Sequence, residues 1–467
     1  MPDIMFALGL ASVMLLLGML LRSVIPFFRT YMVPACVIGG FLGLALMNLD
    51  IVQTISIATF GSIIMHLFVI VFISIILAAP KTDSKSEVGK QVIKGSLALG
   101  TFWNVMYAGI ALVGAGVTFL IGGFWNMDPI YGLLLQFGFI QGPGQAATFG
   151  AMIEGYGWEN AITVGLMYAV IGFAVAFLVG VPLVKLGLKR RLPQFSGDKL
   201  HEAVTRGYYT AEEQEKKEAP SMGTQTTYTG NIDSLTFHFA LVGLCFFIAI
   251  FVTRMWLHVP GAIGTNMNAM PFMNGIFVAV VVRWLMIKLK IDYLKCDVTQ
   301  TKITAWASDY LVIISFMAVG LHFISAFIVP MLILSLIVTV VSLAAALYFA
   351  PRVGGPNAFE RVVAYYVYCT GTAPTVLVLV RVIDPEMKTT TGAEVGLMAL
   401  PALLSQLPVV FIVMSYASGA ATLGTTMAML GGLVVLYLVM LKLFGCWNKP
   451  TLDMSLNRVP EESNKAS

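Results

Sequence analysis

The sequence predicts an all-α polytopic membrane protein built from two inverted repeats. Of its 467 residues, 58% are hydrophobic and only 11% are charged, and the mean hydropathy is +0.86. A soluble globular protein carries about a quarter of its residues as charged side chains, so this class is excluded. The repeat is predicted by two further observations, a duplicated tetrapeptide and the placement of basic residues between apolar segments.

Eleven apolar segments qualify as membrane spans, each of which needs about 20 residues. They lie at roughly 4–21, 31–49, 58–79, 95–122, 160–184, 235–257, 270–287, 308–328, 329–350, 394–416 and 420–444. The first segment follows Asp3 instead of a basic region and precedes no small-residue cleavage site. We therefore interpret it as a retained span and not as a signal peptide.

Two further apolar segments, about 130–153 and 357–383, centre on clusters of Gly and Pro. The tetrapeptide Val-Gly-Leu-Met follows both of them, at 164–167 and at 395–398. We interpret the two segments as re-entrant hairpins, because a break exposed to lipid would leave backbone groups unsatisfied. Ordinary spans kinked by Gly and Pro are the alternative. Matching interruptions in two halves favour hairpins and indicate the substrate site of a secondary transporter.

Loop charge predicts the orientation of the spans. With the N-terminus outside, every basic cluster falls in the cytoplasm, as the positive-inside rule requires. These residues are Arg22, Arg29, Lys81, Lys85, Lys90, Lys94, Lys185, Lys189, Arg190, Arg191, Lys288, Lys290, Lys295, Lys302, Arg352, Arg361, Arg381 and Lys388. The first hairpin then dips from outside and the second from inside, so the halves are inverted. The C-terminus is expected in the cytoplasm.

The expected organisation has four parts. Residues 1–191 form the N-terminal repeat and 234–416 the C-terminal repeat, each with five spans and one hairpin. Residues 192–233 are polar and form a cytoplasmic linker, for which connection is the simplest role and regulation an alternative. Residues 417–467 hold an extra span and a cytoplasmic tail. The five cysteines are scattered without the spacing of a metal or redox site, and no cofactor is expected.

The first hairpin tip has the composition of an anion site. Gly142 and Gly144 permit backbone angles closed to other residues, and Pro143 removes a donor that would remain unsatisfied. A half-helix starting near Gln145 would direct its free amides and positive dipole end into the membrane, where they stabilise an anion. Gln145 and Thr148 are expected to add neutral donors.

The second tip repeats this logic with other residues. Thr372 is an expected N-cap, Pro374 lies in the first helical turn, and Thr370 and Thr375 add hydroxyls. Carbonyls freed near the tips, around Gly142 and Gly371, suit Na⁺. The candidate substrate-binding residues lie at the tips or in the tenth span: Gln141, Gly142, Pro143, Gly144, Gln145, Thr148, Thr370, Gly371, Thr372, Ala373, Pro374, Thr375, Ser405 and Gln406.

Charged residues inside spans are costly and usually functional. Asp309, near the cytoplasmic end of the eighth span, is either a functional carboxylate or only a helix-start residue. Arg381, after the second hairpin, is either a counter-ion for substrate or a membrane-surface anchor. Ser405 and Gln406 either face substrate or make interhelical hydrogen bonds.

Other functional classes fit less well. A cation/proton antiporter requires carboxylates at mid-membrane, which both hairpins lack. An intramembrane enzyme requires a metal-binding or nucleophile motif, and neither His-Glu-x-x-His nor Gly-x-Ser-x-Gly occurs. The small net charge of +4 gives no nucleic-acid patch. A receptor that binds a small anion without transporting it remains an alternative.

The chain resembles the bacterial glutamate:sodium symporter family over most of its length. The resemblance rests on the motifs at 31–34 with Gly39-Gly40, at 142–147, at 156–161 and at 371–375. It implies Na⁺-coupled uptake of glutamate across the plasma (inner) membrane by an elevator-type homodimer, with substrate held between the tips. Pro143 stands where the family usually has His, and the residues before both tips also differ. A different organic anion is therefore an alternative substrate.

Overall fold

The computed structural model describes residues 2–49, 55, 57–78, 86–195, 202–216, 221–325, 327–384 and 388–458. Within these ranges the chain is helical and contains no β-strand, which confirms the all-α prediction. Lys81 and Lys85, which contribute to the charge pattern, lie outside the described residues.

The helices fall into two compact units, each made of segments distant in sequence. The first unit comprises Met1–Val24, Pro34–Lys81 and Arg206–Ala318, and the second comprises Ile25–Val33, Thr82–Thr205 and Val319–Ser467. The first unit contains no part of either predicted hairpin. Both hairpins belong to the second unit.

In its described part, the first unit contains six helices of at least 14 residues, three from each predicted repeat. They are α1 (Pro2–Val24), α3 (Ala35–Asn48), α4 (Ile57–Ala78), α11 (Ser234–Met255), α13 (Pro271–Lys288) and α14 (Asp297–Met317). Short elements join them: α10 (Ala211–Glu215), η3 (Trp256–His258), α12 (Ala262–Asn268) and η4 (Asp292–Leu294). Glycine makes close helix packing possible, because a Cβ on Gly39 would lie 2.4 Å from the Met14 carbonyl oxygen.

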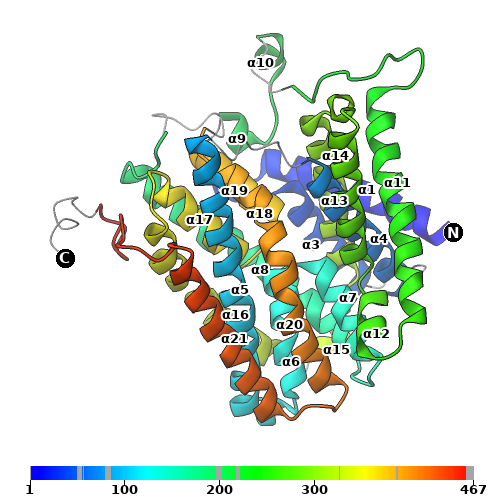
Figure 1. The fold of residues 1–467 in the computed structure, drawn as a ribbon, viewed down its shortest axis with the longest axis vertical. Coiled ribbons are helices and arrows are strands. Elements are labelled where there is room, and N and C mark those ends of the chain that lie inside the picture. Colours follow the sequence, from blue (N-terminus) through cyan, green and yellow to red (C-terminus); the bar gives the residue numbers. More distant parts are fainter. Residues whose placement is uncertain are drawn as a thin grey trace. The chain divides into compact units, whose positions relative to one another are not determined.

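The second unit holds the remaining helices. They are α2 (Pro26–Thr30), α5 (Glu87–Ile121), η1 (Gly122–Trp125), α6 (Pro129–Leu133), the π-helical turn η2 (Gln136–Ile140), α7 (Pro143–Glu154), α8 (Ala161–Lys189), α9 (Glu202–Arg206), α15 (Leu321–Ile324), α16 (Ile328–Phe349), η5 (Ala350–Arg352), α17 (Ala358–Tyr368), α18 (Ala373–Ile383), α19 (Thr391–Leu397), α20 (Ala399–Ala417) and α21 (Leu423–Leu443). In Figure 1, α21 runs alongside α5.

Polar caps mark several helix starts at the ends of apolar segments. The hydroxyl of Ser86 accepts a hydrogen bond from the Gly89 N–H at the start of α5 (3.0 Å), and the Asp128 carboxylate accepts from the Ile130 N–H at α6 (2.9 Å). Each cap satisfies an amide that the helix itself leaves open.

Among the described residues, eight helices are apolar and long enough to cross a membrane, and each coincides with a predicted span. They are α1, α4, α5, α8, α11, α13, α16 and α21. The extra C-terminal segment is thus a helix of 21 residues. The other three predicted spans correspond to α3, which has only 14 residues, to α14, and to α19 with α20.

One predicted span boundary was wrong, and one predicted span is divided into two helices. The segment 308–328 is not one helix, because α14 begins at Asp297 and ends at Met317. The break lies near Gly320 and His322, inside an apolar stretch long enough for one span, so a 20-residue window did not separate it from the segment before. Asp309 accordingly lies inside α14 and is not a helix-start residue. The segment 394–416 is interrupted at Met398. Pro401 follows, and it has no N–H to donate to the carbonyl of Leu397.

The duplicated tetrapeptide occupies different environments in its two copies. A Cβ on Gly165, in α8, would lie 3.2 Å from the Ala146 carbonyl oxygen, so the first copy packs closely against α7. A Cβ on Gly396, in α19, would meet no heavy atom within 4 Å. The second copy also spans the interruption at Met398. The tetrapeptide therefore marks corresponding sequence positions without equivalent packing.

Candidate functional site

The predicted first hairpin is a pair of short helical arms separated at Gly142. The incoming arm consists of α6 and η2, and the outgoing arm is α7, which has 12 residues. At 1.5 Å per residue α7 is about 18 Å long, whereas the hydrocarbon core is about 30 Å thick. The arm is therefore shorter than the hydrocarbon core, as the predicted re-entrant hairpin requires.

The backbone at Gly142 explains the break. Its φ of 81° and ψ of −171° lie in a region that side chains with a Cβ rarely adopt. Pro143 follows as the first helical residue, so α7 begins two residues before the expected start near Gln145. The first helical bond runs from the Ala146 N–H to the Gly142 carbonyl. The N–H groups of Gly144 and Gln145 therefore precede the helical ladder, and no side chain caps them.

The second hairpin has the same design. Its arms, α17 and α18, each have 11 residues. Thr372 occupies the predicted N-cap position, but its hydroxyl makes no capping bond and lies 3.3 Å from the Thr375 hydroxyl. Because Pro374 has no N–H and the Val376 N–H bonds to the Thr372 carbonyl, the N–H groups of Ala373 and Thr375 are left open.

The two tips meet within the second unit. A Cβ on Gly142 would lie only 2.6 Å from Cγ2 of Thr372. Helix α8 contacts both tips, since a Cβ on its Gly172 would lie 2.8 Å from the Thr370 carbonyl oxygen and 2.9 Å from the Phe139 carbonyl oxygen. Glycine at 142 and 172 is thus what permits this close approach.

The hydroxyl groups near the tips are partly engaged within their own helices. Thr148 donates to the Gly144 carbonyl (2.8 Å), so it is not the open donor that the sequence suggested. Thr370 similarly donates to the Tyr366 carbonyl (3.2 Å). These internal bonds leave the backbone amides as the principal donors at both tips.

Helix α20 brings Gln406 to the first tip and Ser405 to α5. The Gln141 carboxamide nitrogen donates to Oε1 of Gln406 (2.7 Å). The neighbouring Ser405 hydroxyl accepts from Nδ2 of Asn104 in α5 (2.6 Å). Asn104 was missed by the sequence reasoning. Its only sequence signal was a carboxamide inside an apolar span, the same signal that singled out Gln406.

The electrostatic character of the tips comes from the backbone. Residues 129–153 and 362–380 contain no Asp, Glu, Lys or Arg. Two open helix N-termini therefore meet without a formal charge on either hairpin segment, and each carries a partial positive charge of about half a unit. Such a place favours an anion held by neutral donors. Within the described part of the chain, no group of three His, Cys, Asp or Glu side chains is suited to hold a metal ion.

Formal charges instead gather at the base of the second hairpin. Arg361 of α17 donates from Nε to Oε2 of Glu394 (2.8 Å) and from Nη2 to Oε1 (2.6 Å). The side chains are only 4% and 1% exposed. Thr390 also donates to Oε1 of Glu394 (2.7 Å), and Asn357 donates to the hydroxyl of Thr391 (2.8 Å). This arrangement ties the entry of the hairpin to the segment after its exit. The sequence reasoning had treated Arg361 only as a topology marker.

Arg381 lies in the last turn of α18, at the opposite end of the helix from the tip, and its side chain is exposed. The structure does not bring it to the meeting point of the tips. It is thus separate from the other candidates.

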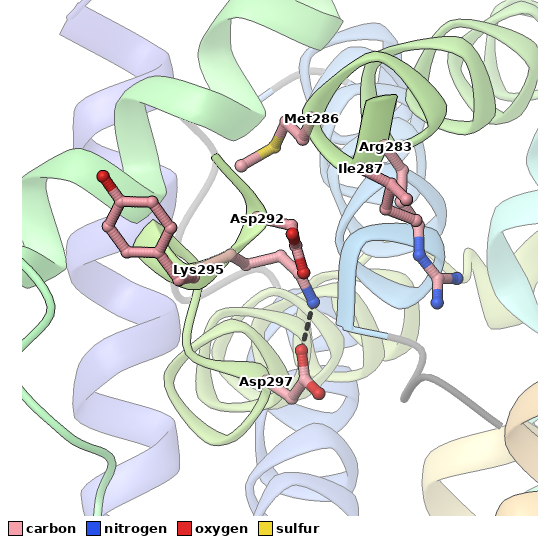
Figure 2. Close-up of a pocket in the computed structure, with 7 residues that line it drawn as sticks. Arg283, Met286, Ile287, Asp292, Lys295 and Asp297 are labelled. Carbon is pink, nitrogen blue, oxygen red and sulfur yellow. Dashed lines mark hydrogen bonds and ion pairs between the residues drawn. The ribbon is translucent and has the colours of Figure 1, made fainter. Parts of the chain in front are cut away.

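A surface pocket of about 390 Å³ lies in the first unit, where α13 connects to α14. Figure 2 shows Lys295 of this pocket directed at Asp297, with which it forms an ion pair. Arg283 donates to the Ile76 carbonyl (3.3 Å). These cations are engaged by oxygen acceptors of the protein, so this pocket lacks the open donors found at the tips.

Comparison with known proteins agrees with this geometry. No curated protein matches the chain. The family of sodium/glutamate symporters, however, matches residues 2–386. This range includes both hairpins and ends before α19, α20 and α21. It covers well over half of the 467 residues. The chain belongs to the sodium/glutamate symporter family.

Proposed function

We propose that this protein is a Na⁺-coupled symporter that imports glutamate or a related small carboxylate. One observation carries the proposal: two uncapped helix N-termini meet at tips that have no charged side chain. Each N-terminus presents two amides, at Gly144 and Gln145 in one case and at Ala373 and Thr375 in the other. Two donor pairs suit the two carboxylates of glutamate.

The division into two units supports an elevator mechanism. The first unit takes three long helices from each predicted repeat, whereas the second takes one hairpin and the helices around it from each. Both tips thus belong to one unit, so that unit can carry a bound solute as a body. The matched division also supports the inverted repeat, because both halves contribute the same kinds of element.

Orientation and assembly follow from other arguments. The positive-inside pattern supports an outside N-terminus and a cytoplasmic C-terminus in a bacterial inner membrane. A homodimer is what the family resemblance implies. The partners of the protein are then the bilayer, Na⁺ and a small anionic solute. Na⁺ is the coupling ion, and no cofactor is proposed.

Reconstituted proteoliposomes test the proposal. An inward Na⁺ gradient should drive accumulation of labelled glutamate, and an equal K⁺ gradient should not. A competition screen with amino acids and dicarboxylic acids then identifies the preferred solute. Binding without accumulation would indicate a receptor, and preference for an unrelated anion would replace glutamate as the substrate. Either result would overturn the proposal in its stated form.

Tip variants test the site itself. Gly371→Leu should abolish uptake, since even a Cβ at this position would lie 3.3 Å from the Thr375 side chain. Gly144→Leu should do the same by placing a large side chain beside the open amides. Gly431→Leu, in α21, is the matched control, because its Cβ would meet nothing within 4 Å. All three should insert into the membrane normally. Wild-type uptake by both tip variants would remove the hairpins from the mechanism.

A further inference from the structure

A group of neutral side chains beside the first tip contains buried oxygens that lack hydrogen-bond donors. Its members come from three elements and are linked by the two bonds already described. We call Asn104, Gln141, Ser405 and Gln406 the carboxamide cluster. Asn104 and Gln141 are 2% and 8% exposed, and Gln406 is 4% exposed.

The orientation of Asn104 follows from its neighbours. Its nitrogen donates to the Gly100 carbonyl oxygen (2.8 Å) and to the Ser405 hydroxyl (2.6 Å). Exchanging the carboxamide nitrogen and oxygen of Asn104 would place its oxygen against the Gly100 carbonyl oxygen, and both atoms are acceptors. The Ser405 hydroxyl donates its own proton to the Ala402 carbonyl (3.3 Å), so it offers none to Asn104. Within the described part of the chain, Oδ1 of Asn104 has no donor.

The first tip contributes two similar oxygens. Gln141 donates through Nε2 to Gln406, and its Oε1 accepts no hydrogen bond among the described residues, although the Tyr107 hydroxyl lies close to the same carboxamide. Gln145, which is 3% exposed, has an Oε1 in the same condition. A buried carbonyl oxygen without a partner is costly, so these oxygens indicate an absent partner, which is either a hydrogen-bond donor or a cation.

We propose that the carboxamide cluster is a subsite for a monovalent cation, with Oδ1 of Asn104 and Oε1 of Gln141 as ligands and Gln145 as a third candidate. The chemistry shared by its possible occupants is a small positive group bound by neutral oxygens: Na⁺ itself, or the ammonium group of an amino-acid substrate. The proposal deepens the proposed symport and rests on it. It places the cation on side chains of α5 and the first tip, in addition to backbone carbonyls.

Its position supplies a reason for coupling. Gln141 directly precedes Gly142, so the cation would lie beside an open helix N-terminus whose partial charge repels it. An anion bound at the tips removes that repulsion. The cation in turn strengthens binding of the anion, and this reciprocal effect is the thermodynamic requirement for symport.

Two variants with opposite predictions test the subsite. Asn104→Leu removes the ligand oxygen at similar volume, and we expect the Na⁺ concentration for half-maximal glutamate uptake to rise at least tenfold. Asn104→Asp keeps an oxygen and adds a negative charge, so this concentration should stay equal or fall. A purely structural role predicts that both variants impair uptake without a Na⁺-specific shift. Tyr437→Phe is the control, because it removes a bond to the Ser405 carbonyl and no proposed ligand.

Comparison of glutamate with glutarate, which lacks the amino group, distinguishes the two occupants. If the ammonium group occupies the subsite, Asn104→Leu abolishes the preference for glutamate and leaves the Na⁺ dependence unchanged. If Na⁺ occupies it, the Na⁺ dependence shifts and the preference remains. If neither quantity changes, the subsite is refuted.

Thermal unfolding of purified protein in NaCl and in KCl, without substrate, gives an independent measurement. Na⁺ occupancy predicts a higher Tm in NaCl for the wild type, and this difference should be lost in Asn104→Leu. Absence of glutamate uptake by the wild type would refute the proposed function but would leave this measurement valid. Normal wild-type uptake, with unchanged Na⁺ dependence, substrate preference and Tm difference in Asn104→Leu, would refute the subsite alone.

Discussion

The ion pair at the base of the second hairpin gives a quantitative prediction. Glu394→Gln keeps the shape of the side chain but removes the charge that faces Arg361. The guanidinium then remains buried without its hydrogen-bonded counter-charge. Removing one member of a buried pair costs about 3–5 kcal/mol. The full range applies because both side chains are almost completely buried and the contact is bidentate.

This energy should appear as local opening of the hairpin. Cys369 lies next to the second tip and is 0% exposed, so it reports on that opening without an added label site. Since each 1.4 kcal/mol corresponds to about a tenfold change in population, alkylation of Cys369 should accelerate at least about a hundredfold. Cys245, also 0% exposed but in α11 of the first unit, should react at its wild-type rate.

The assay is alkylation by a membrane-permeant maleimide, with the modified peptides quantified by mass spectrometry and uptake measured in parallel. Uptake should fall in Glu394→Gln. The double variant Arg361→Gln/Glu394→Gln removes both charges and should recover much of the protection at Cys369. Wild-type rates at Cys369 and wild-type uptake in Glu394→Gln would refute the reasoning. Equal acceleration at Cys245 would indicate general destabilisation instead of hairpin opening.

Two other predictions concern a tip and a loop. Gly142→Ala should sharply reduce uptake, because it combines a positive φ with a Cβ only 2.6 Å from Thr372. Gly157→Ala is the control. Gly157 has a similar φ, but its Cβ would meet no heavy atom within 4 Å, so this variant should still transport. Burial alone would raise the pKa of the Cys296 thiol. Hydrogen bonds from Thr224 and from Thr299, in the first turn of α14, outweigh this effect and lower the pKa to about 6. The thiolate therefore predominates above pH 6, and the pH midpoint of Cys296 alkylation should rise in Thr224→Val, which loses the hydroxyl donor (3.5 Å). An unchanged midpoint in this variant would contradict the role given to that bond.

Much of the fold was predictable because its signals are local. The length of the apolar segments predicted the eight helices that are long enough to span a membrane. Gly142 predicted a helix break, because its backbone angles are rarely adopted by residues with a Cβ. The position of Thr372 at a helix start was also predictable from its place before Pro374. These features depend on chain chemistry within a few residues, which is what a sequence displays directly.

Some features could not be predicted because they depend on distant partners. Whether Thr148 offers a donor depends on its bond to Gly144, and the end of α14 at Met317 lies inside a stretch that is apolar enough for one span. The pairing of Arg361 with Glu394 joins residues separated by both arms of a hairpin. Charge alone made Arg361 resemble any other cytoplasmic cation.

The sequence by itself determined that this protein is a polytopic helical membrane protein with two interrupted segments in matching places. Composition and loop charge suffice for that, because transfer into lipid is decided segment by segment. Only the tertiary structure decided that the two tips meet, that α8 contacts both through Gly172, and that Asn104 joins Gln141 through α20. These contacts join residues far apart in the chain, and packing selects them through shape and hydrogen-bond complementarity that no local pattern encodes.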